Sequence, residues 1–211
     1  MKEILRSAAI LGLVAILGTS LLAGVDRLTA RRIAEQEKRV ILEQLGQIIP
    51  DHYDNPLLQD RISFQDEQHF PNGQTVTAYR ARRQEEPLAI VMKFQAVSGY
   101  NGNITLLAGI NFDGSLRGVR VISHKETPGL GDGIETEKSD WILNFAGKTL
   151  QDPEPRKWAV RRDGGDFDQF TGATITPRAI VDAVFQALRF FDSNREFLFE
   201  EPAETAEGTA P

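Results

Sequence analysis

The segment DFDQFTGATITPRA, residues 166–179, is the most informative part of the sequence. Its hydroxyl side chains are those of Thr171, Thr174 and Thr176, and the small residues Gly172 and Ala173 lie between the first two. A predicted helix follows, and the first N–H groups of a helix lack partners inside it, so this position suits a phosphate group. Ordinary capping is the alternative, with Thr176 as the N-cap and Pro177 at the first helical position.

Four segments upstream carry the pattern of strands bounded by turn residues. They are residues 75–81, 88–97, 103–112 and 116–124. Asp113-Gly114 between the last two predicts a hairpin. A short helix is expected within residues 138–150, irregular chain over 151–165, and a longer helix over Pro177–Phe191. The predicted fold class is therefore α+β: one mixed α/β domain with an antiparallel sheet and flanking helices.

The N-terminal region predicts a membrane anchor. Residues 7–25 form 19 positions without a charge, about 28 Å of helix, which matches the hydrocarbon core of a bilayer. A cleaved signal peptide is the alternative, but the apolar run is long and ends without a small-x-small cleavage site. Both flanks are basic, the downstream one more so, and by the positive-inside rule this favours a cytoplasmic domain.

We therefore expect four regions. They are residues 1–25 with the anchor, a linking helix over 26–50 that Pro50 ends, a folded domain over 51–199, and a disordered acidic tail over 200–211.

The amino-acid composition argues against several classes of function. The net charge of −6, without a basic face, argues against nucleic acid as a partner. The chain has no cysteine, which excludes disulfides, iron–sulfur clusters and thiolate zinc sites. Its three histidines lie far apart in the sequence, which gives no support to a haem or zinc site. A redox function would therefore need an organic cofactor.

A second candidate segment is SHKETPGLGDGIE, residues 123–135. Its alternating glycines would let the loop lie against a planar ring or a phosphate, but their spacing does not fit the dinucleotide fingerprint G-x-G-x-x-G. An ordinary surface loop is the alternative interpretation. His124, Glu126 and Asp132 could also be drawn as an acid–base group, although such loop residues are more often solvated.

These two segments together resemble the FMN-binding domain family. DFDQFTGAT resembles its flavinylation sequence, with five matching positions: Asp168, Thr171, Gly172, Ala173 and the acceptor Thr174. HKETPGLG followed by KSDW is similar to a second family segment. With the anchor in front, the order resembles the family of G subunits of the Rnf/Rsx ion-translocating electron-transport complexes of bacterial inner membranes. Thr171 replaces the usual serine, and Pro177 and Gly133 also depart from the family pattern.

The resemblance implies covalent FMN, joined through its phosphate to the Thr174 hydroxyl by a flavin transferase with FAD as donor. It implies that Glu126, Thr127 and Leu130 border the flavin ring. Asp168 would serve the transferase, because a carboxylate repels a phosphate in the finished flavoprotein. The phosphodiester would lie near the N–H groups of the helix that starts close to Thr176.

The same resemblance implies an electron-relay subunit that works with other subunits of a membrane complex. It places residues 7–25 in the inner membrane and the flavin domain in the periplasm, against the charge count. A stand-alone flavoprotein reductase and an anchored binding or assembly module without redox activity are the alternative functions.

Overall fold

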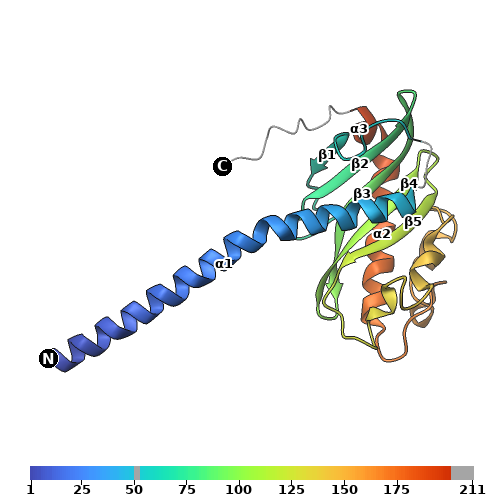
Figure 1. Ribbon diagram of the computed structural model, residues 1–211. Coiled ribbons are helices and arrows are strands. Elements are labelled where there is room, and N and C mark those ends of the chain that lie inside the picture. Colours follow the sequence, from blue (N-terminus) through green and yellow to red (C-terminus); the bar gives the residue numbers. More distant parts are fainter. Residues whose placement is uncertain (50–52, 201–211) are drawn as a thin grey trace. The chain divides into compact units, whose positions relative to one another are not determined.

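The computed structural model describes residues 1–49 and 53–200, and the chain divides into two compact units, Met1–Glu43 and Gln44–Pro211. Helix α1, Lys2–Ile48, begins in the first unit and ends in the second (Figure 1). Within it, Lys2–Ala30 is long and apolar enough to cross a membrane. The predicted anchor and linking helix are thus one helix. Pro50 and the tail beyond Glu200 lie outside the described residues.

The second unit is built on an antiparallel sheet whose strands follow one another in chain order. The strands are β1 (Arg61–Phe64), β2 (Val76–Arg83), β3 (Glu86–Gly99), β4 (Gly102–Asn111) and β5 (Leu116–Ser123). The four predicted strands are confirmed as β2 to β5, and so is the hairpin at Asp113-Gly114, where Gly114 has a φ of +91°. Strand β1 was not predicted, because its four residues are too few for a periodic pattern.

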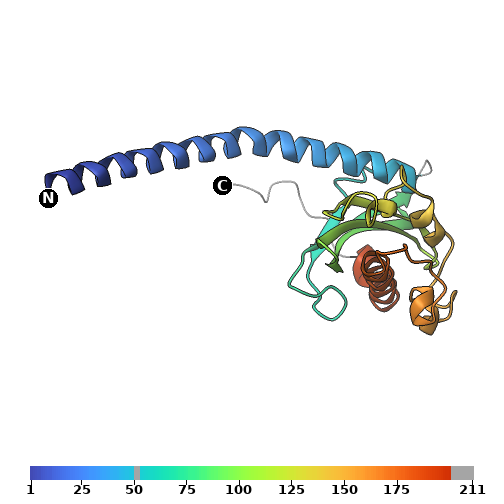
Figure 2. The same ribbon diagram turned by 90° about the horizontal axis from the view of Figure 1, so that it is seen from below.

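Helix α2, Ile175–Ser193, packs against one face of the sheet (Figure 2). Its buried side chains recur at helical spacing in Ile180, Val184 and Leu188, each at most 1% exposed. They join Phe94 and Leu106 of the sheet in the main core. This packing fixes the start of α2 against the sheet, and the candidate site lies at that start.

The opposite face of the sheet receives the end of α1. Leu107 and Gly109 alternate with core residues of β4, so they belong to this second face. Ile48 is buried there, and a Cβ atom at Gly109 would lie only 2.1 Å from its Cγ2 atom. Glycine at position 109 therefore lets the last turn of α1 approach the strand.

Short helices fill the connections. They are η1 (Asp132–Ile134), η2 (Trp141–Phe145), η3 (Pro155–Lys157), η4 (Arg161–Asp163) and the terminal α3 (Arg195–Glu200). The short helix expected within residues 138–150 is confirmed as η2, a 3-10 helix. Phe145 stacks on Phe167 with ring centroids 4.8 Å apart, so this half of the domain anchors the segment before Asp168.

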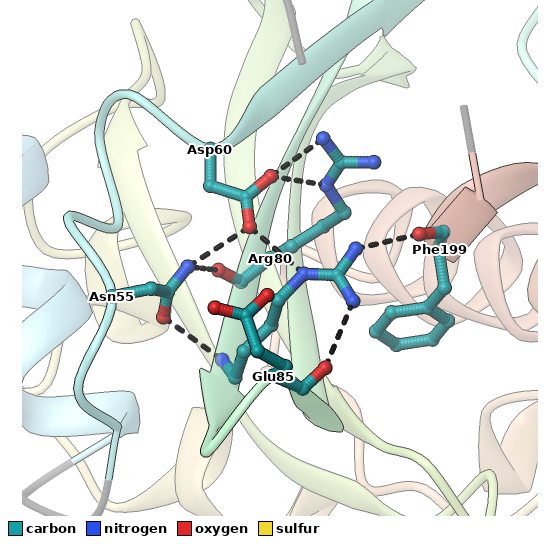
Figure 3. Close-up of polar contacts among 6 residues, drawn as sticks. Asn55, Asp60, Arg80, Glu85 and Phe199 are labelled. Carbon is teal, nitrogen blue, oxygen red and sulfur yellow. Dashed lines mark hydrogen bonds and ion pairs between the residues drawn. The ribbon is translucent and has the colours of Figure 1, made fainter. Parts of the chain in front are cut away.

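A polar group at the β1–β2 side of the sheet, which we name the Asp60 cluster, comprises Asn55, Asp60, Arg80 and Arg82. Arg80 is buried and the other three are partly exposed. Figure 3 shows the hydrogen bonds around Asp60. The Asp60 carboxylate accepts hydrogen bonds from Arg80 Nε at 2.6 Å, Arg82 Nε at 3.0 Å and Asn55 Nδ2 at 2.9 Å. Arg82 also donates to the Phe199 carbonyl at 2.5 Å. The cluster thus ties the loop before β1 and helix α3 to strand β2.

Candidate functional site

The start of α2 differs from the prediction. The helix begins at Ile175, Thr174 is the N-cap residue, and the Thr174 side chain makes no capping hydrogen bond. The predicted N-cap Thr176 and first helical residue Pro177 are therefore wrong; both are buried inside the first turn. A tight turn precedes the helix, closed by the Ala173 N–H on the Phe170 carbonyl at 3.1 Å, with Gly172 at a φ of +80°. This turn lets the helix start early.

Thr176 has a partner far away in the sequence. Its hydroxyl donates to Glu126 Oε2, a residue 50 positions earlier, and Thr176 is fully buried. The other carboxylate oxygen of Glu126 accepts the Asn101 N–H at 3.1 Å, and Glu126 is only 5% exposed. The expectation that Glu126 is solvated is therefore wrong, because the first turn of α2 and the turn before β4 enclose it.

His124 holds the backbone of Glu126. Its Nδ1 atom accepts the Glu126 N–H at 3.0 Å, so the ring proton is on Nε2, which donates to Glu135 Oε1 at 2.7 Å. Asp132 instead accepts the Gly129 N–H at 2.8 Å. These bonds organise the loop and do not form an acid–base group. We name Asn101, His124, Glu126 and Thr176 the Glu126 cluster.

Two further contacts join the loop region to the threonine segment. Trp141 Nε1 donates to the Asp168 carbonyl at 2.7 Å. A Cβ atom at Gly133 would lie 3.1 Å from the ring of Phe170, which explains why glycine stands at this position. The two predicted motif segments therefore form one structural unit.

Between these segments lies a cavity of about 210 Å³. Its lining residues are Tyr100, Glu126, Thr127, Leu130, Gly131, Gly172, Ala173, Thr174, Ile175 and Thr176. The structure thus brings together most of the site residues predicted from the sequence. Tyr100 and Ile175 were missed; the aromatic side chain within the turn sequence SGYNG was the only signal for Tyr100.

Asp168 and Thr171 do not line this cavity. The Asp168 side chain is 58% exposed, and its Oδ1 atom lies 2.5 Å from Arg161 Nη1. Thr171 is exposed in the turn before the helix. Both predicted residues are therefore exposed and lie outside the cavity.

The three threonines consequently differ in what their hydroxyl groups can do. Thr171 is exposed outside the cavity, and the Thr176 hydroxyl is buried and bound to Glu126. Thr174 lines the cavity, is partly exposed, and is not engaged in capping. Thr174 alone among them combines a place on the cavity wall with access from outside.

The electrostatics at the helix start favour an anion. The N–H groups of Ile175 and Thr176 lie in the first turn of α2, where N–H groups have no acceptor within the helix, and the helix dipole adds partial positive charge. Pro177 contributes no N–H, but Arg178 already bonds back to the Thr174 carbonyl at 3.2 Å. The Arg178 side chain is committed to Asp163 at 2.6 Å, and this bond lowers the pKa of Asp163. Backbone groups are therefore the main attraction for an anion here.

The residues present fit FMN. The cavity is smaller than the roughly 300–1,000 Å³ that encloses a complete ligand, so it suits the phosphate and the adjoining chain. The rim carries exposed apolar side chains against which a planar ring can lie: Tyr100, 66% exposed, Leu130, 50%, and Ile175, 42%. The site thus offers a polar floor beside the helix start and an apolar rim.

Comparison with known proteins agrees with this geometry. Residues 99–189, which contain all the cavity residues, match the FMN-binding domain, and residues 1–48 match the RnfG N-terminal region. The chain is 45% identical to the G subunit of the ion-translocating oxidoreductase complex of Shewanella loihica, over 96% of both chains. It is 46% identical to that of Pseudomonas aeruginosa, over 97% of this chain and 96% of the relative. The chain therefore belongs to the family of G subunits of ion-translocating oxidoreductase complexes.

Proposed function

We propose that the chain is a membrane-anchored flavoprotein subunit that carries FMN covalently on Thr174 and relays electrons within an ion-translocating complex. Its family and its FMN-binding domain support the flavoprotein function and the presence of partner subunits. One observation carries the choice of residue: the Thr174 side chain lines the cavity at the N-cap of α2 without a capping bond. When bound, FMN supplies the electron-transfer chemistry.

Attachment requires a flavin transferase with FAD as donor. The Thr174 Oγ1 atom forms a bond to the phosphorus of the FMN half, the bond from that phosphorus to AMP breaks, and AMP leaves. The hydroxyl proton passes to a base of the transferase. The resulting phosphodiester keeps one negative charge beside the N–H groups of Ile175 and Thr176, which the helix dipole stabilises. Thr127 and Leu130 border the flavin from the facing loop.

Asp168 serves the transferase in this proposal. Its side chain is exposed and lies outside the cavity, so it does not support bound FMN directly. We expect Asp168→Asn to slow flavinylation. Asp163→Asn is the matched control, because Asp163 is another exposed acid paired with an arginine on this part of the domain. Flavinylation of Asp168→Asn at the rate of the control would refute this role.

We place the flavin domain in the periplasm and the N-terminus in the cytoplasm. A covalent tether supports this, because free FMN would diffuse away from an extracytoplasmic site. The basic residues after the span favour the opposite orientation. Protease added to spheroplasts should digest the domain; digestion only after the inner membrane is permeabilised would reverse the assignment.

The main test is flavin fluorescence in a denaturing gel after production with the flavin transferase. Wild type should fluoresce, and Thr174→Ala should not. Thr75→Ala is the control, because Thr75 is an exposed threonine outside the cavity, and it should fluoresce like wild type. Fluorescence of Thr174→Ala at the wild-type level would exclude Thr174 as the attachment residue.

A further inference from the structure

Glu126 is a buried carboxylate on the cavity wall. Each of its oxygens accepts one protein hydrogen bond, from the Thr176 hydroxyl and from the Asn101 N–H. A carboxylate oxygen has two lone-pair sites, so the group has capacity for further donors. The side chain lines the cavity, so a molecule in the cavity can supply them.

The place of Glu126 relative to Thr174 indicates which part of FMN it meets. Its bonding partner Thr176 is two residues after the attachment residue, in the first turn of the same helix. In FMN the ribityl chain directly follows the phosphate, and the ring comes last. The carboxylate therefore lies nearest the ribityl chain, whose hydroxyl groups are hydrogen-bond donors. The apolar rim of Tyr100, Leu130 and Ile175 is left for the ring.

Glu126 is also held from several sides. His124 accepts its backbone N–H, and the two donors fix its carboxylate. A Cβ atom at Gly131 would lie 2.8 Å from Glu126 Oε2, so the glycine at this position leaves room for the carboxylate. A carboxylate held this firmly offers a donor one defined position, which is the requirement for a specific binding group.

We propose that Glu126 binds the ribityl chain of FMN by accepting hydrogen bonds from its hydroxyl groups, and that Thr176 and Asn101 are positioning residues for this carboxylate. This inference rests on the proposed attachment of FMN at Thr174. It assigns Glu126 to the ribityl chain in place of the ring. It also explains why an acid lies close to a phosphodiester: the acid binds the polyol part of the cofactor. This contact fixes the direction in which the ring extends from the cavity.

The test uses the full-length chain in detergent, loaded by the flavin transferase, with the variants Glu126→Gln, Thr176→Val and Thr176→Ser. The mass of the peptide that contains Thr174 reports attachment. The flavin's visible circular dichroism and fluorescence anisotropy report its immobilisation. We expect Glu126→Gln and Thr176→Val to keep the adduct but to shift both signals toward those of free FMN. Thr176→Ser, which keeps the hydroxyl, should restore the wild-type signals.

A second measurement separates ribityl binding from a general loosening of the site. Wild type and Glu126→Gln are loaded from an FAD analogue in which an alkyl chain of equal length replaces the ribityl chain. We expect the difference between the two proteins to disappear with this analogue. Wild-type signals in Glu126→Gln loaded with ordinary FMN, or an unchanged difference with the analogue, would overturn the inference. Absence of an adduct from wild type would instead contradict the proposed attachment.

Discussion

The Asp60 cluster and the Glu126 cluster each centre on a carboxylate with little solvent exposure, but they satisfy it differently. Asp60 faces the guanidinium groups of Arg80 and Arg82, so its negative charge is matched by positive charge. The donors to Glu126 are a neutral hydroxyl and a neutral N–H group. A buried charge is costly unless it is paired. The first cluster therefore holds segments of the chain together, whereas the second leaves a carboxylate able to bind a ligand.

The largest expected effect concerns the Asp60 cluster. Asp60→Ala removes the common acceptor and leaves Arg80, which is 2% exposed, without this partner. We expect the free energy of unfolding, measured by denaturant titration in detergent, to fall by about 3–5 kcal/mol. The fraction of folded molecules that accept FMN should not change. A stability close to wild type, or a loss of flavinylation in the folded fraction, would contradict the separation of the two clusters.

Gly131→Ala tests how closely the Glu126 cluster is packed. The new Cβ atom would lie 2.8 Å from Glu126 Oε2 and 3.1 Å from Thr176 Oγ1. We expect a loss of about 1–3 kcal/mol in unfolding free energy from overpacking, together with a weaker flavin circular dichroism. At Gly118 the nearest atom is the flexible end of Arg120, 3.4 Å away, so Gly118→Ala is the control. Equal behaviour of the two variants would show that the cluster tolerates displacement.

Trp141→Phe tests the link between the loop region and the threonine segment. It removes the indole donor to the Asp168 carbonyl and should cost about 0.5–1.5 kcal/mol. It should also slow flavinylation, because the turn that presents Thr174 loses a support. Trp158→Phe removes a similar donor to the Thr149 carbonyl, away from the turn, and is the matched control. Flavinylation of both variants at the wild-type rate would disprove the positioning role of Trp141.

Asp113 is an exposed acid in the β4–β5 turn, so its effect on stability can be compared with that of the less exposed carboxylates of the two clusters. Hydrogen bonds from the Ser115 side chain and backbone lower the pKa of Asp113. Its contribution to stability is therefore present above the unfolded pKa of about 3.9 and is lost as the pH falls through the lower folded value. We expect Asp113→Asn to cost about 0.5 kcal/mol at neutral pH and the two stability curves to converge in acid. A difference that does not vary with pH would contradict this account.

Local patterns explain how much of the fold could be predicted. Strands β2 to β5 and helix α2 follow from apolar periodicity and turn residues, which depend on neighbours in sequence. Strand β1 is held by its pairing with β2, where Ile62 faces Ala78, and by the stacking of Phe64 on Phe190 of α2. These are contacts between distant parts of the chain, so no local signal marked the strand. The Asp60 cluster could not be predicted either, since Arg82 bonds to both Asp60 and the Phe199 carbonyl, which only the folded chain brings together.

The candidate site, too, could be predicted only where a local sequence pattern marked its residues. The threonine segment and the glycine-rich loop were identified from their residues, and the structure brings both to one cavity. The predicted N-cap was wrong because capping rules consider only adjacent residues, whereas the Thr176 hydroxyl binds Glu126, 50 positions away. Ile175 and Tyr100 were missed because an exposed apolar side chain becomes informative only when its surroundings are known.

The most direct test of the central claim is the mass of the peptide covering residues 163–178 from the chain isolated from its native host. We expect the mass of the unmodified peptide plus FMN minus one water, with fragmentation placing the addition on Thr174. A peptide that carries no addition, or carries it on Thr171 or Thr176, would contradict the account.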